Sequence, residues 1–356
     1  MSKQKIRVAV LFGGVSSEHK ISLISATQMI KNLPDYCEVI CIGITQDGRW
    51  VEYTGDVEKI CEGQWESDRS LRTAIVSPDR SHKGIVLMGE NSFEIVPVDL
   101  CFPVLHGKNG EDGTIQGLFQ LAGIPFVGCD LISSANCMDK EMTHTVLEAN
   151  GIQMAKWTIV NEQKMKDFPA FAQEAEEKLG YPMFVKPANA GSSVGVSKAY
   201  DRDQLYTACL TALKEDKKAV VEEFVDAQEV ETAVLGNEEP QAAGVVGELV
   251  PLVDFYTYEA KYVDNTTALY IPGRVSEETS LKLRQTAEKA YKAIGCSGFS
   301  RIDFFVRKSD GAVILNEINN IPGFTAISMY PKLWEHCGVS CPELVEKLVQ
   351  LGLDRN

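Results

Sequence analysis

The chain has 356 residues, of which 44% are hydrophobic and 24% charged, a composition typical of globular rather than disordered proteins. Because a chain of this length exceeds one compact core, we expect two or three domains. Its 35 basic and 50 acidic residues leave a formal net charge of −15, which argues against nucleic acid or an anionic membrane as partner.

The chain shows neither an apolar stretch long enough to span a bilayer nor a signal-peptide layout at its start, so we expect a cytoplasmic protein. The ten cysteines are then expected to be reduced thiols rather than a disulfide framework. Cys37 with Cys41, and Cys337 with Cys341, have a spacing that zinc sites use. No matching second pair or histidine cluster follows, so zinc is not expected.

The first third of the chain has the pattern of an α/β domain. An apolar run ends at Gly13 and Gly14 and leads into a helical segment, which is the β-loop-α opening of a parallel sheet. We therefore interpret residues 1–129 as a Rossmann-like domain. The elements expected in it are strands at 6–12, 39–44, 98–105 and 125–128 and helices at 18–33 and 114–122.

Two further units follow, at 130–222 and 223–356, and the absence of a flexible linker predicts that the domains pack closely. The central unit is expected to contain two helices, strands at 183–187, 194–199 and 219–224, and a helix at 202–214. The last unit is expected to contain strands at 230–236, 242–250, 300–306 and 312–318, a loop at 254–272 and a helix at 276–294.

Glycine-rich segments follow two of the predicted strands in the first domain. The first, at 13–18, opens a helix whose free amides can bind an anion, but its spacing is not that of a dinucleotide site. Glu18 is either a charge favoured by the helix dipole or a partner for a substrate ammonium. The second segment, at 106–113 (HGKNGEDG), is either a tight turn or a ligand site at a strand end.

A third glycine-rich segment, at 190–195 (AGSSVG), lies between two predicted strands. A Walker loop would carry Gly-Lys-Ser/Thr and lead into a helix, so this segment is interpreted as a mobile loop able to cover phosphates. Lys186, at the end of the preceding strand, is either an ordinary edge residue or a phosphate ligand.

The strongest chemical pattern is a candidate hairpin formed by the last two predicted strands. Side chains alternate between the faces of a strand, so Arg301 and Asp303 share one face, as do Glu317 and Asn319. If the strands pair, the four converge, and two carboxylates with an amide oxygen are hard ligands suited to Mg²⁺. The turn at 321–323 (IPG) adds a glycine amide suited to an anion. The alternative is the solvated polar face of an ordinary hairpin.

Taken in order, these segments resemble the D-alanine–D-alanine ligase branch of the ATP-grasp enzymes. HGKNGEDGTIQG at 106–117 and GFSRIDFF…LNEINNIPG at 298–323 are similar to the two signatures of that branch, and GGVSSEH, MDK, FVKP and AGSSVG fall at the expected places. The resemblance covers nearly the whole chain. It implies an α/β, ATP-grasp architecture in which a Rossmann-like domain and two α+β domains clamp ATP.

The resemblance also implies roles for individual residues toward the amino-acid substrates. Glu18 would hold the ammonium of the first D-alanine, supported by Ser192 and Tyr262, with His106 nearby.

The remaining implied residues surround the second amino acid, ATP and the metal. Ser328 and Met329 would contact the second amino acid, and Arg301 with the Gly323 amide would form an oxyanion hole. ATP would be held at its phosphates by Lys140, Lys186, Ser193 and Lys261, at adenine by Glu222 and the backbone near Val225, and at ribose by Glu229. Two Mg²⁺, for which Mn²⁺ can substitute, would be bound by Asp303, Glu317 and Asn319.

The implied reaction is ATP-dependent formation of D-alanyl-D-alanine through an acyl phosphate, for peptidoglycan precursors, by a homodimer. The nearest alternative is a ligase of vancomycin-resistance type that takes D-serine, with a D-lactate ligase the weaker alternative. Apolar Met329, where resistance ligases tend to carry arginine, favours the methyl group of D-alanine, and Tyr262 argues against D-lactate. A non-catalytic ATP-binding module and a Rossmann oxidoreductase are the remaining alternatives. Asn320 departs from the family signature and is expected to matter little because it points away from Asn319.

Overall fold

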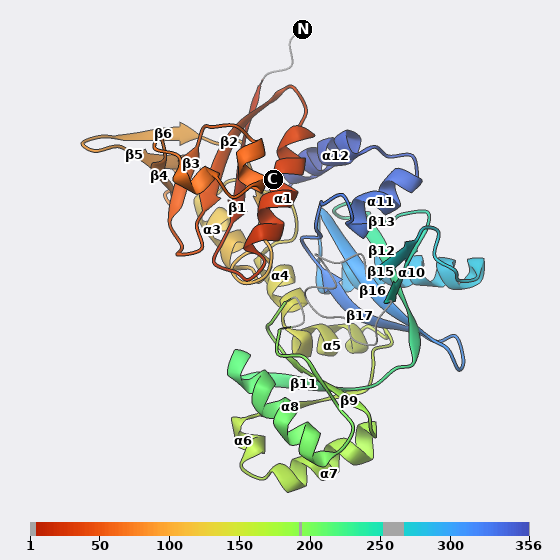
Figure 1. Cartoon of the computed structure of the whole chain (residues 1–356). Helices are drawn as coiled ribbons and strands as arrows, with labels where there is room; N and C mark the ends of the chain where they lie inside the picture. Colours follow the sequence, from red (N-terminus) through yellow and green to blue (C-terminus); the bar gives the residue numbers. More distant parts are fainter. Residues whose placement is uncertain (1–4, 192–193, 252–266, 356) are drawn as a thin grey trace.

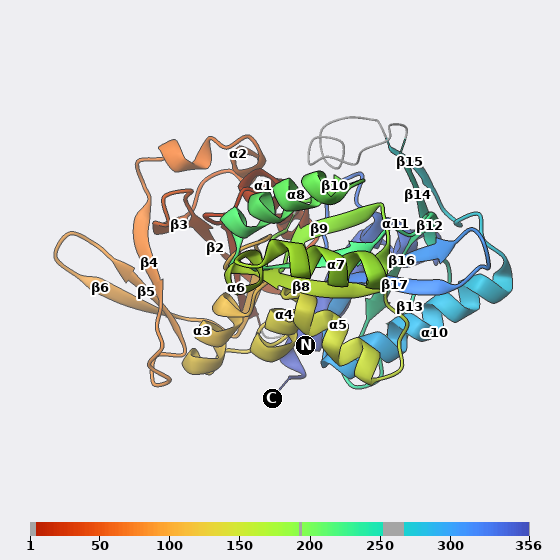
Figure 2. The same ribbon diagram turned by 90° about the horizontal axis from the view of Figure 1, so that it is seen from below.

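The computed structural model describes residues 5–191, 194–251 and 267–355, and it arranges them around three β-sheets (Figure 1). Seen from below, the four-stranded sheet and its helices lie across the junction of the other two units (Figure 2). No helix in the described ranges is both long and apolar enough to cross a membrane.

The first sheet has seven strands in the order β6-β5-β4-β3-β2-β1-β7. Its strands are β1 (Ile6–Gly13), β2 (Cys37–Ile44), β3 (Trp50–Tyr53), β4 (Arg72–Val76), β5 (Gly84–Met88), β6 (Phe93–Pro97) and β7 (Leu100–Val104). β1 pairs in parallel with both β2 and β7, as expected of a Rossmann-like unit. The antiparallel strands β3 to β6 were not predicted, since they are short and lie in a polar part of the sequence.

Helices cover both faces of this sheet because its central strands are apolar on both sides. One face packs on α1 (His19–Lys31) and on the C-terminal helix α12 (Cys341–Leu353), and the other packs on α3 (Thr114–Ala122). In Figure 1 the blue α12 accordingly lies beside the red α1. The short α2 (Glu58–Cys61) and a 3₁₀ turn (Trp65–Ser67) complete this unit. The strand expected at 125–128 is reduced to an isolated bridge between Phe126 and Cys101, so that prediction was wrong.

The second sheet has four strands in the order β10-β9-β11-β8. They are β8 (Trp157–Asn161), β9 (Met183–Pro187), β10 (Ser197–Ala199) and β11 (Lys218–Glu223). Helices α7 (Phe168–Leu179) and α8 (Arg202–Glu215) cover one face, where Val185 and Val221 belong to their core, while α6 (Glu162–Met165) flanks β8. Because side chains alternate, Lys186 and Glu222 point to the other side, which we call the inner face.

The third sheet has six strands, with the path β15-β14-β12-β16-β17 and β13 paired to β12. They are β12 (Ala227–Leu235), β13 (Gln241–Ala242), β14 (Gly247–Pro251), β15 (Thr267–Tyr270), β16 (Phe299–Arg307) and β17 (Val313–Asn319). Two expectations were wrong here, because the strand expected at 242–250 is interrupted between β13 and β14, and the loop expected at 254–272 contains β15.

Both faces of the third sheet are also covered. Helix α10 (Glu277–Ile294) packs on one face together with residues from α4 (Leu131–Met138) and α5 (Lys140–Ala149). The opposite face packs on α11 (Met329–His336), whose core continues into that of the first sheet. Helices α11 and α12 were not predicted. The apolar half of this second face anchors α11, which leaves its polar half for the site described next.

Candidate functional site

Two glycine-rich segments meet at one edge of the first sheet. β1 and β7 are neighbouring parallel strands, so the segments after Gly13 and Val104 leave from the same edge. The Glu18 carboxylate lies between glycines, since a Cβ placed on Gly107 or Gly191 would be 2.7 or 2.9 Å from its Oε2. Buried Glu18 occupies the N-cap of α1, yet its side chain makes no capping hydrogen bond. The Glu18 side chain therefore does not cap α1.

His106 ties this edge to the turn after β17. Its Nε2 is 3.2 Å from Ser25 Oγ, and Ser25 Oγ accepts the Phe324 amide at 3.2 Å. Burial lowers the pKa of His106, but Glu111, with its Oε1 3.6 Å from Nδ1, and Glu18 outweigh this effect, and the net pKa is raised. His106 therefore lies in a negative environment beside Glu18, where a substrate ammonium would be favoured.

The two predicted strands of the hairpin do pair. Arg301 lies opposite Asn319 and Asp303 opposite Glu317, so the four side chains share one face of the third sheet. We call them the carboxylate hairpin. The Arg301 guanidinium donates to Asp303 from Nε and from Nη2, both at 2.7 Å. Burial lowers the pKa of Arg301, but Asp303, Glu231 and Glu317 raise it well above its usual value.

Glu231 is a third carboxylate that sequence reasoning missed. It lies on β12 directly opposite Asp303, and its Oε2 is 3.2 Å from Arg301 Nε. The alternation of β12 carried this signal, because Glu229 and Glu231 share a face, but the pairing of β12 with β16 was not evident from sequence. Glu229, the residue implied for ribose, lies opposite Phe305 on the same face as Asp303.

Gly323 and Ser328 lie together beyond the end of β17. A Cβ on Gly323 would be 3.0 Å from Ser328 Oγ, and Ser328 Oγ accepts the Thr325 amide at 2.9 Å. Met329, the first residue of α11, is buried, and a Cβ on Gly247 would meet its sulfur at 2.3 Å. The surroundings of Met329 are therefore apolar and closely packed.

The inner face of the four-stranded sheet carries a buried ionic cluster. Lys186 Nζ donates to Glu222 Oε2 at 2.6 Å, and His144 Nε2 lies 3.0 Å from the other carboxylate oxygen. Burial raises the pKa of Glu222, but Lys186 and His144 outweigh this effect and lower it to about 2. The aromatic rings of Trp157 and Phe184 lie on the neighbouring strands opposite Glu222. Val225, only half-buried, follows in the connection to β12.

Contacts join the inner face to the carboxylate hairpin. Lys186 Nζ also donates to Asn316 Oδ1 at 3.4 Å. The register of β16 with β17 shifts at this point, so Asn316 has no partner residue on β16. This bulge places Asn316, which sequence reasoning missed, beside Lys186 and next to Glu317.

Lys140 connects the glycine-rich segment after β9 to helix α5. Its Nζ donates to Ala190 O at 2.8 Å, and its backbone amide donates to Ala188 O at 3.0 Å. Because Gly191 follows directly and touches Glu18, Lys140 lies close to the substrate edge of the first sheet. Four residues implied by the resemblance lie outside the described ranges, namely Ser192, Ser193, Lys261 and Tyr262.

Asn320 joins the end of β17 to the first domain. The side chain is buried and its Nδ2 donates to Glu111 O at 2.9 Å. It thereby fastens the segment at 106–113 to the end of β17. This contact was not expected from the sequence, and the small effect expected of Asn320 stays a prediction.

The donor types of the carboxylate hairpin fit a hard divalent cation. Asp303 and Glu317 face each other across the strand pair, with the Asn319 amide one pair further along. Within the described ranges, no three His, Cys, Asp or Glu side chains are grouped closely enough to hold a metal by themselves. A cation here would therefore need further oxygens from a ligand such as a phosphate, which is how Mg²⁺ is commonly bound.

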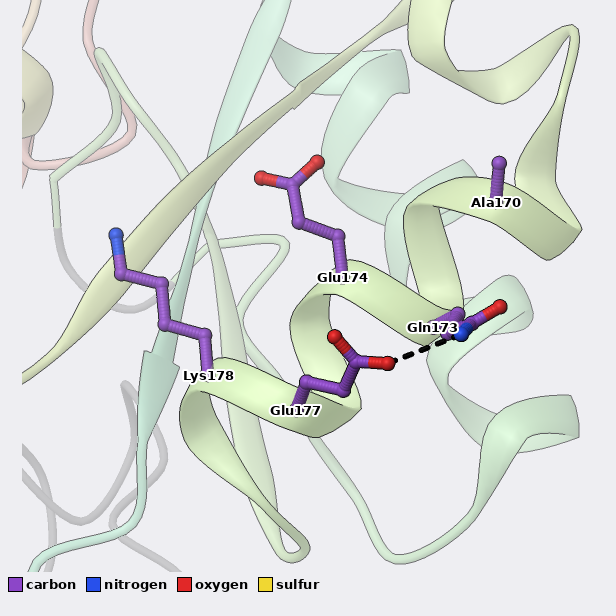
Figure 3. Close-up of a pocket in the computed structure, with 5 residues that line it drawn as sticks. All are labelled: Ala170, Gln173, Glu174, Glu177 and Lys178. Carbon is purple, nitrogen blue, oxygen red and sulfur yellow. Dashed lines mark hydrogen bonds between the residues drawn. The ribbon is translucent and has the colours of Figure 1, made fainter.

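A surface depression on α7 is unrelated to this constellation (Figure 3). One helix alone lines it, through Ala170, Gln173, Glu174, Glu177 and Lys178. Gln173 Nε2 donates to Glu177 Oε1 at 2.9 Å, an ordinary pair one helical turn apart. Because α7 covers the face of the four-stranded sheet opposite Lys186, the depression lies away from all the clustered polar groups.

Comparison with known proteins agrees with this geometry. Residues 7–129 match the family profile described as D-ala D-ala ligase N-terminus, and residues 146–350 match that of the D-ala D-ala ligase C-terminus. A D-alanine–D-alanine ligase of Acetivibrio thermocellus is 49% identical, with 99% of this chain and 96% of that protein covered. One of Caldicellulosiruptor bescii is 45% identical at the same coverage.

Solved structures are similar over the full length as well. The VanG D-Ala:D-Ser ligase of Enterococcus faecalis has a TM-score of 0.90 and 42% identity, covering 98% of this chain and 100% of its own. The D-alanine–D-alanine ligase of Coxiella burnetii has a TM-score of 0.87 and 32% identity, covering 99% and 95%. With both family profiles and whole-length relatives in agreement, the chain belongs to the D-alanine–D-alanine ligase family.

Proposed function

We propose that this chain joins two D-alanines at the expense of ATP, giving D-alanyl-D-alanine, ADP and phosphate for peptidoglycan precursor synthesis. The observation that carries the proposal is the convergence of three groups of side chains. Glu18 and His106 supply a site for the substrate ammonium. Lys186 would bind the ATP phosphates and Glu222 the adenine, and the carboxylate hairpin supplies a cation site. The Lys186–Asn316 contact links the second group to the third.

The chemistry explains why these groups belong together. A carboxylate is a poor acyl donor, so its oxygen first takes the γ-phosphoryl group of ATP, and ADP leaves. Lys140 and Lys186 neutralise phosphate charge during this transfer. The amine of the second D-alanine then attacks the acyl carbon, and phosphate leaves with the C–O bond electrons. Arg301 and the Gly323 amide stabilise the oxyanion formed in between.

Glu18 and His106 orient the first D-alanine. The Glu18 carboxylate pairs with the substrate ammonium, and buried surroundings strengthen that pair relative to water. Asp303, Glu317 and Asn319 would hold Mg²⁺, which when bound neutralises phosphate oxygens. Arg301 is kept next to Asp303 by two hydrogen bonds, so the oxyanion donor and the cation site are built on one strand.

A D-serine ligase is the second candidate, favoured by the similarity to the VanG structure. The apolar side chain of Met329, at the position implied for the second amino acid, supports D-alanine instead, because a hydroxymethyl group would require a polar partner. We further propose a cytoplasmic homodimer. Light scattering of the purified chain checks its mass, and cell fractionation checks its location.

Product analysis tests the proposal directly. The purified chain is incubated with ATP, MgCl₂ and D-alanine, alone or with equimolar D-serine or D-lactate, and the products are identified by mass. We expect ATP hydrolysis to require D-alanine, and D-alanyl-D-alanine to be the main product in every mixture. A predominance of D-alanyl-D-serine would favour the second candidate, whereas ATP turnover without any dipeptide would refute both.

A further inference from the structure

Helix α5 contributes a buried histidine to the inner face that the proposed mechanism does not use. His144 is 3% exposed, and its ring lies 5.0 Å from that of Trp157 with an interplanar angle of 30°. Its Nε2 is 3.0 Å from Glu222 Oε1. The ring is therefore fixed by a stacking contact and by one polar contact, and the polar contact is to the carboxylate that would read adenine.

The hydrogen bond has a defined direction. Glu222 is ionised, with its pKa lowered to about 2, because the pull of Lys186 and His144 exceeds the effect of burial. An ionised carboxylate only accepts, so His144 must donate from Nε2. His144 Nδ1 is buried and has no hydrogen-bond partner in the part of the chain that the structure describes. A buried polar atom without a partner is destabilising, so the histidine is not explained by fold stability alone.

Glu222 is held by a donor on each oxygen. Lys186 occupies Oε2 at 2.6 Å while His144 occupies Oε1. In the proposed reaction the Lys186 ammonium moves toward a phosphate of ATP. The Glu222 carboxylate, still buried, then loses part of the positive charge that stabilises it. A second, permanent donor keeps the carboxylate in place. His144 lies on α5 and Lys186 on β9, so His144 need not move when Lys186 does.

We propose that His144 is a positioning residue for the nucleotide, holding the Glu222 carboxylate ready for the base while Lys186 engages phosphate. The inference rests on the proposed function. Lys140 precedes His144 by four residues on α5, so both side chains project from one face of that helix. Lys140 reaches Ala190 O and His144 reaches Glu222. One rigid helix thus sets the spacing between the phosphate end and the base end of the site.

Paired amide variants test the inference. Gln places its amide nitrogen where His has Nε2, whereas Asn reaches only the position of Nδ1. Binding of ADP with MgCl₂, without D-alanine, is measured by titration calorimetry on the full chain. We expect His144→Gln to bind ADP within about threefold of the unaltered chain and His144→Asn to bind it about tenfold more weakly, as for the loss of a hydrogen bond to a charged group. The KM for D-alanine should stay unchanged in both.

A double-variant cycle separates positioning from general loosening. If His144 acts through Glu222, then His144→Asn combined with Glu222→Gln should bind ADP no more weakly than Glu222→Gln alone. Thr145→Ala, one residue further on the exposed side of α5, is the matched control and should bind ADP normally. Thermal unfolding of each variant shows the folded fraction.

The outcomes are distinct. ADP affinity of His144→Asn equal to that of the unaltered chain would overturn the inference, as would equal losses in the Gln and Asn variants or multiplicative losses in the double variant. If the unaltered chain binds no ADP, the proposed function fails and takes the inference with it. If it binds ADP and only the His144 variants behave unexpectedly, the proposed function is untouched.

Discussion

The carboxylate hairpin and the inner face of the four-stranded sheet both bury charged side chains, but the ratio of acidic to basic groups differs between them. On the hairpin side, one guanidinium is shared by Asp303 and Glu231, with Glu317 facing them across the strand pair. On the inner face, one carboxylate is shared by Lys186 and His144. Among the residues that the structure describes, the first cluster therefore places three carboxylates around one guanidinium, whereas the second places one carboxylate between two basic side chains.

This difference indicates what each region lacks before its ligands bind. Three carboxylates on one face suit a divalent cation, whereas the Glu222 carboxylate already has a donor on each oxygen. Like charges that face each other raise the free energy of the folded state, so we expect the hairpin carboxylates to stabilise the fold less than Glu222 does. The inner face should instead contribute to stability at neutral pH.

The largest expected effect is at the hairpin. We expect Glu317→Gln to lower kcat by roughly 10³-fold or more, because a cation ligand and its charge are lost. Its free energy of unfolding in the absence of metal should be unchanged or slightly raised, since one of several neighbouring carboxylates has been neutralised. Steady-state kinetics and urea unfolding measure the two quantities, and near-normal activity in this variant would argue strongly against the assignment.

Arg301→Ala is the matched contrast. The rate of dipeptide formation should again fall by roughly 10³-fold, here because the oxyanion donor is missing. Here the free energy of unfolding should also fall, by about 3 kcal/mol, because buried Asp303 and Glu231 lose their shared cation. Circular dichroism should still show a folded chain. Equal free energies of unfolding for the Arg301 and Glu317 variants would contradict the expectation that the buried carboxylates depend on Arg301 for their stability.

The inner face predicts an acid-dependent loss of stability. The pKa of Glu222 falls from 4.5 to about 2 on folding, so its contribution is present above pH ~4.5 and is lost as pH drops toward about 2. The size is about 3 kcal/mol at most. Glu222→Gln should show a correspondingly shallower dependence of the unfolding free energy on pH as the pH falls below about 4.5. Parallel slopes for the two chains would contradict a compensated Glu222.

The smallest expected effect concerns the hydrogen bond that joins the segment at 106–113 to the end of β17. Asn320→Ala removes the hydrogen bond to Glu111 O, which should lower stability by about 1 kcal/mol. Because Glu111 neighbours His106, the KM for D-alanine should rise by roughly threefold while ADP binding stays normal. A variant with unchanged kinetics and stability would return Asn320 to the minor part that its sequence position suggested.

Local patterns in the sequence identified much of this molecule. Strand alternation predicted the shared face of Arg301, Asp303, Glu317 and Asn319, and the register of β16 with β17 confirms it. The glycines that flank residues 114–122 predicted a helix with the bounds that α3 has in the structure. Such features depend on residues close together in the chain, where the 2.0 and 3.6 residue periods and turn residues operate.

Long-range neighbours decided the rest. Glu231, His144 and Asn316 each contact a side chain on another element, and their own segments do not identify that partner. Asn316 also depends on a bulge, which shifts the register of one strand by a residue and is not visible as a break in alternation.

The sequence by itself determined the family, several of the strands and helices that carry the site, and the residues available for chemistry, because motif order and local periodicity are properties of the chain alone. Only the tertiary structure decided how charge is balanced. Whether a buried carboxylate is compensated depends on which strand or helix lies against it, and that follows from sheet order and packing across distant segments.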